Sequence, residues 1–167
     1  TLTHAFVARL DGLATRVLDT RKTRPGWRLL EKYAVRCGGG RNHRMDLASM
    51  AMLKDNHLAA VGGDIVAAVR QVRSIVPAGT WIEVEADRRE QVERAIESGA
   101  DVIMLDNMAL DAMRECVALV AGRAIVEASG GVTLDRVRAI AETGVDWISV
   151  GALTHSAPAL DLGLDFS

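Results

Sequence analysis

A repeat of 21 to 22 residues runs through the second half of the chain and limits the folds that this sequence can adopt. Four short apolar runs end at or next to Glu85, Asp106, Ala128 and Val150, which are spaced at this interval. Each run is too short for a stable helix and suits a strand buried in a sheet. Amphipathic stretches separate the runs, and one strand, one helix and two loops fit this length. The repeat therefore predicts successive βα units with parallel strands.

Two more apolar runs extend this pattern into the first half. Residues 16–19 and 50–54 bring the number of expected strands to about six or seven. A complete eight-stranded barrel usually needs about 250 residues, whereas this chain has 167. We therefore expect an α/β fold, an open or incomplete (β/α) TIM-like barrel with about six to seven parallel strands. A doubly wound sheet is the alternative, because local patterns alone do not separate the two.

Residues typical of helix ends support the βα units. Asp64 precedes one amphipathic stretch, and Asp87 with Glu90 forms a variant of the capping box before another. Gly99 marks the end of that second helix, and Thr133 predicts the start of a third. One more helix is expected to start near residue 26, with an apolar face made of Trp27, Leu30, Ala34 and Cys37.

Composition excludes several classes of protein. No apolar run approaches the length of about 20 residues that spans a bilayer, so we expect no membrane partner. Cys37 and Cys116 have neither the spacing of metal ligands nor that of a disulfide framework. A reduced, cytoplasmic compartment is the simplest expectation.

The charges are unevenly distributed along the chain. The net charge is −2, yet residues 21–54 hold nine Lys or Arg against two acids. A local positive field on an acidic protein suits a small polyanion, whereas a nucleic-acid partner would call for a basic domain as a whole. We therefore expect no nucleic acid, although a basic face that is only solvated is the alternative reading.

Polar residues follow each expected strand. In parallel α/β folds the functional residues lie at the carboxyl ends of the strands and in the loops that follow. Here those positions fall in residues 19–23, 54–57, 83–85, 105–107, 127–131 and 151–156. A barrel with only a structural role would not need a polar rim on every strand.

Two of these loops have features of phosphate sites. Ser129 and Gly130 come before the helix expected at Thr133, so free backbone N–H groups could meet an anion there. Gly151 permits a similarly close approach after the last strand, with His155 as a side-chain donor. The alternative is that the glycines only ease the turn from strand to helix.

Charged residues at other strand ends suggest a metal and catalytic groups. Glu85 and Asp106 end neighbouring strands and could share one divalent cation, and carboxylates with substrate oxygens suit Mg²⁺. The alternative is that these acids are helix caps or simply solvated. Lys22 and Lys54 stand at strand ends, where their side chains are placed to point into the barrel. A histidine–arginine pair in a loop, such as His43–Arg44, more often lies at the surface.

These residues occur in strings that resemble the quinolinate phosphoribosyltransferase family, also called carboxylating nicotinate-nucleotide diphosphorylases. The resemblance covers nearly the whole chain and is carried by the joint order of its motifs. The strings are DTRKT at 19–23, PG at 25–26, GGGRNHR at 38–44, LKDNH at 53–57, EVE at 83–85, LDN at 105–107, EASGG at 127–131 and VGALTHS at 150–156.

The resemblance implies an activity, with a role for each matching position. The family reaction joins quinolinate to the ribose of 5-phosphoribosyl 1-diphosphate and releases diphosphate and carbon dioxide. Its product, nicotinate mononucleotide, serves NAD synthesis. By this resemblance the dicarboxylate and phosphates are bound by Arg21, Lys22, His43, Arg44 and Lys54, the 5-phosphate by Ser129, Gly130, Gly151 and His155, and Mg²⁺ by Glu85 and Asp106. The implied catalytic groups are Lys22, Lys54, Glu85 and Asp106.

The resemblance also implies how the chain is organised. Residues 1–167 correspond to the C-terminal catalytic barrel, and family members carry an N-terminal domain that is absent from this chain. We therefore expect a homodimer or higher homo-oligomer in the full-length family, and little turnover by these 167 residues alone. Two alternatives stay open: a paralogue from a molybdenum-transport locus with another substrate, or a barrel that only binds a phosphate ligand.

Overall fold

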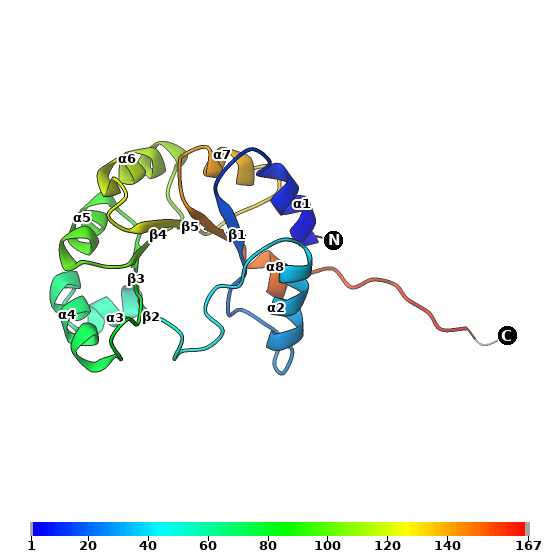
Figure 1. Cartoon of the computed structure of the whole chain (residues 1–167), viewed down its shortest axis with the longest axis horizontal. Helices are drawn as coiled ribbons and strands as arrows, with labels where there is room; N and C mark the ends of the chain where they lie inside the picture. Colours follow the sequence, from blue (N-terminus) through cyan, green and yellow to red (C-terminus); the bar gives the residue numbers. More distant parts are fainter. Residues whose placement is uncertain (1, 166–167) are drawn as a thin grey trace.

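Six parallel strands form one curved sheet with helices on its outer side (Figure 1). The computed structural model describes residues 2–165. The strands are β1 Arg16–Leu18, β2 Ala51–Leu53, β3 Ile82–Ala86, β4 Val102–Asp106, β5 Ile125–Ser129 and β6 Trp147–Ser149. The helices are α1 Leu2–Arg9, α2 Arg28–Cys37, α3 Asp55–Ala60, α4 Ile65–Ile75, α5 Arg89–Ser98, α6 Leu110–Val120, α7 Val137–Ala141 and α8 Ala152–His155. Within residues 2–165, none of these helices combines the length and the apolar character needed to cross a membrane.

The order of the strands is that of an open barrel. Neighbours in the sheet run β1-β6-β5-β4-β3-β2, and each pair is parallel. The order follows the chain from β2 to β6 without reversal, and β1 adds at the edge beyond β6. A doubly wound sheet reverses its order at a switch point, so that alternative is wrong. The predicted barrel and the approximate ends of its six strands are confirmed.

The barrel stays open between β1 and β2. Residues 38–50 cross this side (Figure 1), and Arg41 forms a single parallel bridge with Leu18. The backbone N–H of Arg41 donates to the carbonyl of Val17 at 2.8 Å, and that of Asp19 donates to the carbonyl of Arg41 at 3.1 Å. This segment therefore occupies part of the position that a further strand would have next to β1. As a result His43, which follows Arg41 closely, lies against the inside of the barrel.

The two faces of the sheet differ in chemistry. Ile82 and Val84 on β3 are fully buried in the aliphatic core between sheet and helices. Burial of such a side chain contributes about 1.5–3 kcal/mol. Alternate residues point to the opposite face of a strand, and Glu83 and Glu85 occupy those positions on β3. The inner face of this barrel is therefore polar, which continuous apolar runs alone would not have suggested.

The helix ends follow the sequence signals only in part. Asp64 caps α4 by accepting from the N–H groups of Val66 and Ala67 at 3.0 and 3.1 Å, and Gly99 ends α5 at φ +71°. The predicted capping box at Asp87 is wrong: its N–H donates to the side chain of Gln91 at 2.7 Å. The helix expected from Thr133 starts only at α7, after a turn.

The predicted packing of α2 is also wrong. Trp27, Leu30 and Cys37 lie at the surface, and the indole of Trp27 is 55% exposed. The buried face instead carries Glu31, Lys32 and Val35. Glu31 pairs with Arg24, and Lys32 pairs with an aspartate of the barrel. Partnered charges thus decide which side of this helix faces inward, and hydrophobicity does not.

Candidate active site

A cavity of about 810 Å³ opens at the carboxyl ends of the strands. It contains all eleven residues that the sequence singles out: Arg21, Lys22, His43, Arg44, Lys54, Glu85, Asp106, Ser129, Gly130, Gly151 and His155. The polar strand ends therefore meet in one place, as expected for a parallel barrel. Met52 and Met104 add an apolar wall to the same cavity.

One wall of the cavity is cationic and short of acceptors. The Nε of Arg21 is buried and has no hydrogen-bond partner among residues 2–165. Arg44 Nη1 donates to the carbonyl of Met50 at 2.9 Å, and Nη2 lies 3.5 Å from Met52 Sδ. Burial first, and then the charge of Arg21, lower the pKa of Arg44 against the opposing effect of Glu83. Because both guanidinium groups lack a full set of acceptors, this wall suits an anion.

Not all of the basic cluster in residues 21–54 faces this cavity. Lys32 is completely buried in an ion pair with Asp19, and Arg24 pairs with Glu31 at 2.8 Å. The basic side chains that line the cavity are Arg21, Lys22, Arg44 and Lys54. The positive field is therefore smaller than the count along the sequence suggests, but it is concentrated on the cavity.

Asp19 and Lys32 hold the backbone that carries His43. Asp19 Oδ1 accepts from Lys32 Nζ and from the N–H of His43 at 2.9 Å, while Oδ2 accepts from Asn42 Nδ2 at 2.5 Å. Lys32 Nζ also donates to the carbonyl of His43 at 3.2 Å. Both charges are buried and paired, which makes this a rigid anchor for the segment that crosses the open side.

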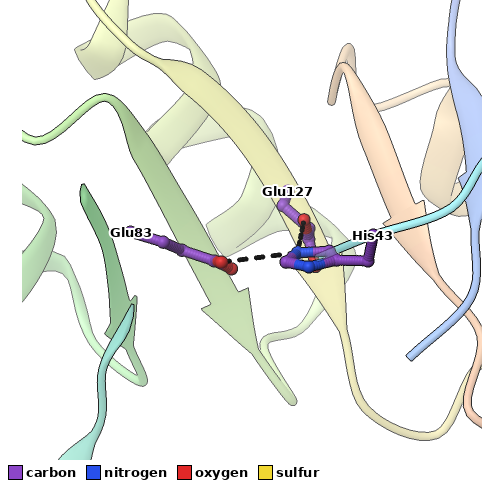
Figure 2. Close-up of side chains that lie close together, drawn as sticks. All are labelled: His43, Glu83 and Glu127. Carbon is purple, nitrogen blue, oxygen red and sulfur yellow. Dashed lines mark hydrogen bonds and ion pairs between the residues drawn. The ribbon is translucent and has the colours of Figure 1, made fainter. Parts of the chain in front are cut away.

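The ring of His43 lies between two buried carboxylates (Figure 2). Its Nε2 is 3.1 Å from Glu127 Oε2 and 3.3 Å from Glu83 Oε2. Ser149 Oγ donates to the other oxygen of Glu127 at 2.5 Å. Neither oxygen of Glu83 has a hydrogen-bond partner within the described residues. The three side chains thus form a polar layer beneath the cavity.

The charge of His43 is set by these neighbours. Burial lowers the pKa of His43, but the hydrogen bond to Glu127 and the charges of Glu127 and Glu83 outweigh it and raise the pKa to about 10. The N–H of Arg44, 2.8 Å from Nδ1, opposes this rise because it donates to the unprotonated nitrogen. The two carboxylates set the direction of the shift, since charged partners outweigh one neutral hydrogen bond. In either state Nε2 carries a hydrogen that faces the carboxylates.

Stability should therefore depend on pH through His43. A pKa raised above the unfolded value means that the stabilisation is fully present below about pH 6.5 and is lost as pH rises through about 10. Measured by urea unfolding, wild type should exceed His43→Gln by about 1.5–3 kcal/mol at pH 6, as expected for hydrogen bonds to charged groups. The difference should shrink toward pH 10. A difference that grows with pH would contradict this assignment.

Acidic side chains form the middle of the cavity. Glu85 Oε2 accepts from Lys54 Nζ, and Asp106 Oδ2 accepts from Asn107 Nδ2 at 2.8 Å. Each carboxylate has a second oxygen for which the described residues show no hydrogen bond. Both therefore keep an oxygen that could bind a cation or a polar ligand in the cavity.

Two glycine loops form the far end. Gly130 and Gly131 have φ values of +91° and +56°, and a Cβ on Gly130 would lie 2.2 Å from Asn107 Oδ1. A Cβ on Gly151 would lie 2.9 Å from His155 Nε2 and 3.9 Å from Lys22 Cδ. At both glycines the backbone therefore lies very close to neighbouring polar side chains. The prediction that a helix begins directly after this glycine loop is wrong, because a turn precedes the short helix α7.

Sequence reasoning gave no individual role to five residues that organise this site, although three of them lie in the expected strand-end segments. Asp19 and Lys32 anchor the backbone, and Glu83, Glu127 and Ser149 surround His43. One signal could have identified the glutamates: each stands alone between apolar residues within a strand, in IEV and VEA. A lone acid at an inward position of a strand needs a partner across the barrel.

The family model described as "Quinolinate phosphoribosyl transferase, C-terminal domain" matches residues 1–165. The chain belongs to the quinolinate phosphoribosyltransferase family. The family resemblance of the eight motifs is thereby confirmed.

Relatives within this family agree in sequence and structure. The chain is 47% identical over 165 residues to a probable carboxylating nicotinate-nucleotide pyrophosphorylase of Bacillus subtilis (strain 168), covering 99% of this chain and 57% of the relative. It is 45% identical over 168 residues to the Mycobacterium leprae (strain TN) protein of the same activity name, covering 99% and 58%. The crystal structure of NadC from Streptococcus pyogenes superposes with a TM-score of 0.90 at 45% identity, covering 95% of this chain and 55% of that one. The chain thus spans somewhat more than half the length of these relatives.

Proposed function

We propose that this chain forms the catalytic barrel of an enzyme that transfers the phosphoribosyl group of 5-phosphoribosyl 1-diphosphate to quinolinate. Diphosphate and carbon dioxide leave, and the product is nicotinate mononucleotide for NAD synthesis. The observation that carries this proposal is the buried, unpartnered Nε of Arg21 beside Arg44 in a cavity whose other end is formed by two glycine loops. The activity names of the relatives support it.

The cationic wall suits the dicarboxylate. Arg21 and Arg44 offer planar donors, which pair well with carboxylates. Met52 and Met104 supply a polarisable apolar wall for a flat aromatic ring. A ligand bound there would give the orphaned donor of Arg21 an acceptor. Quinolinate, a ring with two adjacent carboxylates, has this combination of features.

The glycine loops suit the 5-phosphate. Backbone N–H groups in left-handed or irregular turns form concave sites that bind anions. Gly130 and Gly151 provide such backbone, and Lys22 and His155 lie beside Gly151. Ser129 adds a hydroxyl on the same rim. This end of the cavity would hold the phosphate and leave the ribose facing Glu85 and Asp106.

Acidic side chains lie between the cationic wall and the glycine loops. They suit a magnesium ion and a ribose that becomes positively charged during the reaction. Glu85 and Asp106 each keep one oxygen free of hydrogen bonds to the described residues, which fits Mg²⁺ bound by two carboxylates, waters and diphosphate oxygens. When bound, Mg²⁺ would offset the negative charge of the departing diphosphate. Lys54 neutralises part of the charge of Glu85, so that the site is not overly acidic before the substrate binds.

The geometry supports the following order of events. The dicarboxylate is held on the cationic wall and the phosphate in the glycine loops, so the ring nitrogen faces the anomeric carbon. As diphosphate leaves, the carboxylates of Glu85 and Asp106 stabilise the oxocarbenium-like ribose. The ring nitrogen attacks and becomes positively charged. Its positive charge stabilises the carbanion left on the adjacent ring carbon when carbon dioxide departs, and a proton taken up from solvent then replaces the carboxylate.

Arg44→Ala tests the assignment of the two ends. We expect it to weaken quinolinate binding by about 2–5 kcal/mol, as when one partner of a buried charge pair is lost. Binding of 5-phosphoribosyl 1-diphosphate should change by less than about 0.5 kcal/mol. NMR titration of each ligand with the purified chain measures both.

A surface control completes that experiment. Arg36→Ala removes an exposed cation of α2 that does not line the cavity, and it should leave both affinities as in wild type. Equal losses for both ligands in Arg44→Ala would show that this wall does not bind the dicarboxylate.

A homo-oligomer and a cytoplasmic location stay predictions.

A further inference from the structure

Two carboxylates are buried beneath the cavity, where packing alone gives no reason for them. Glu83 on β3 and Glu127 on β5 have no exposed surface. The residue of β4 paired with Glu127 is Met104, an apolar side chain at the same level of the sheet. Burial of a charged pair is often less stable than an apolar replacement. These two acids therefore call for a role other than holding the barrel together.

Each oxygen of Glu127 already has a side-chain hydrogen-bond partner. Its Oε1 accepts from Ser149 Oγ at 2.5 Å, and its Oε2 is 3.1 Å from His43 Nε2. The serine on β6 and the histidine on the crossing segment hold this carboxylate from two sides. Glu127 lines the cavity together with the ring of His43, which Figure 2 shows pointing at it.

Glu83 acts by charge on two neighbours. It lies 3.3 Å from His43 Nε2 without hydrogen-bond geometry, and neither of its oxygens has a hydrogen-bond partner in the described part of the chain. Its negative charge also favours the charged form of Arg44. Met52, whose sulfur contacts Arg44 Nη2, is the paired residue of Glu83 on β2. The charge of Glu83 thus acts on both His43 and Arg44.

We propose that Glu127, with the charge of Glu83 beside it, is a positioning residue that holds the His43 ring by its Nε2 and thereby keeps Arg44 in place at the cavity wall. Asp19 fixes the backbone of His43 and Glu127 fixes its ring, and the N–H of Arg44 donates to Nδ1 of the same ring at 2.8 Å. The expected effect on ligand binding rests on the proposed function, in which Arg44 binds the dicarboxylate. The orientation of the His43 ring is independent of the proposed function.

His43, Glu83 and Glu127 also have the composition of a transition-metal site. Their ligand atoms all lie within 4.8 Å of one another. In the geometry described above, however, the hydrogen on Nε2 occupies the position between the carboxylates that a cation would take. A metal at this place would displace that hydrogen, so the two arrangements exclude each other and can be separated by experiment.

The test compares replacements of Glu127 that keep or remove its acceptor. Glu127→Gln keeps an oxygen for Nε2–H, whereas Glu127→Met keeps the volume and removes the acceptor. We expect Glu127→Met to raise the Kd for quinolinate by about ten- to hundredfold, the range seen when an outer partner of a metal-binding histidine is lost. The Kd for 5-phosphoribosyl 1-diphosphate should stay within about twofold, and Glu127→Gln should recover most of the loss. Glu93→Met, the same replacement at an exposed site on α5, serves as the control.

A second measurement does not depend on any ligand. In ¹⁵N NMR spectra of the free chain, the Nε2–H signal of His43 should be present in wild type and Glu127→Gln, and lost or strongly shifted in Glu127→Met. If Glu127→Met does not fold, Ser149→Ala loosens Glu127 more mildly and should show the same selectivity with a loss of about threefold.

Several results would overturn the proposal. One is a folded Glu127→Met variant with unchanged His43 signals. Another is an equal loss of affinity for both ligands. A third is Zn²⁺ binding to wild type at one equivalent with loss of the Nε2–H signal, which would show a metal site instead. Failure of wild type to bind quinolinate would count against the proposed function, and the ligand-free spectra would still decide the role of Glu127.

Discussion

Asp19→Ala should lower the free energy of unfolding by about 3–5 kcal/mol, the usual cost of breaking a buried ion pair from one side. The ammonium group of Lys32 has no exposed surface, and Asp19 is its only carboxylate partner among residues 2–165. The substitution would also leave the N–H of His43 without its acceptor and remove one of the two acceptors of the Asn42 amide. The transition in urea should therefore move to lower concentration with little change in slope.

Two further variants separate the buried charge from other effects of the substitution. Asp19→Asn combined with Lys32→Met removes both charges but keeps an acceptor for His43 N–H, and it should recover most of the lost stability. Asp11→Ala removes an exposed aspartate and should change stability by less than about 0.5 kcal/mol. If Asp19→Ala is no more harmful than Asp11→Ala, the ion pair does not anchor the crossing segment.

The barrel could be predicted from the sequence because its signals are local and repeated. Each strand is an apolar run bounded by polar residues, and the spacing from Glu85 to Asp106 recurs along the chain. Parallel strands bring all their carboxyl ends to one rim, so polar residues far apart in sequence, such as Arg21 and His155, were expected to share a cavity. The structure places them together.

What the sequence could not supply are pairings between distant residues. Lys32 belongs to a cluster of basic residues and was expected to contribute to a positive field. Only the position of Asp19 directly after β1, next to the buried side of α2, shows that this lysine is neutralised inside the protein. Trp27 and Leu30, in contrast, lie at the surface. Hydrophobic periodicity cannot reveal a helix whose buried face is held by partnered charges.

The role of His43 depends on contacts of the same kind. In the sequence it stands in a glycine-rich loop, where a histidine is most often at the surface. The bridge between Leu18 and Arg41 turns that loop into the barrel, and two glutamates from separate strands meet its ring. Each of these contacts joins residues more than 20 positions apart. The chemistry of the cavity floor therefore arises when the fold brings residues of three separate motifs into contact.

Gly130→Ala is expected to weaken binding of 5-phosphoribosyl 1-diphosphate by about 2–3 kcal/mol, or about 30- to 150-fold. The backbone of Gly130 has φ +91°, a conformation that side chains rarely adopt. A Cβ would lie 2.2 Å from Oδ1 and 2.4 Å from Cγ of Asn107. Asn107 cannot move away freely, because its Nδ2 donates to Asp106 at 2.8 Å. The substitution would thus disturb both the phosphate loop and one of the acids near the ribose.

Backbone strain and loss of the loop can be separated with a second glycine. Gly99 ends α5 at φ +71°, has no atom within 4 Å of an added Cβ and does not line the cavity. Gly99→Ala should therefore cost about 1–2 kcal/mol of stability and leave the affinity for 5-phosphoribosyl 1-diphosphate unchanged. Gly131→Ala, whose Cβ would meet only Arg136 Nη1 at 3.4 Å, should have an intermediate effect on binding. Unchanged affinity in folded Gly130→Ala would show that the phosphate binds at another part of the rim.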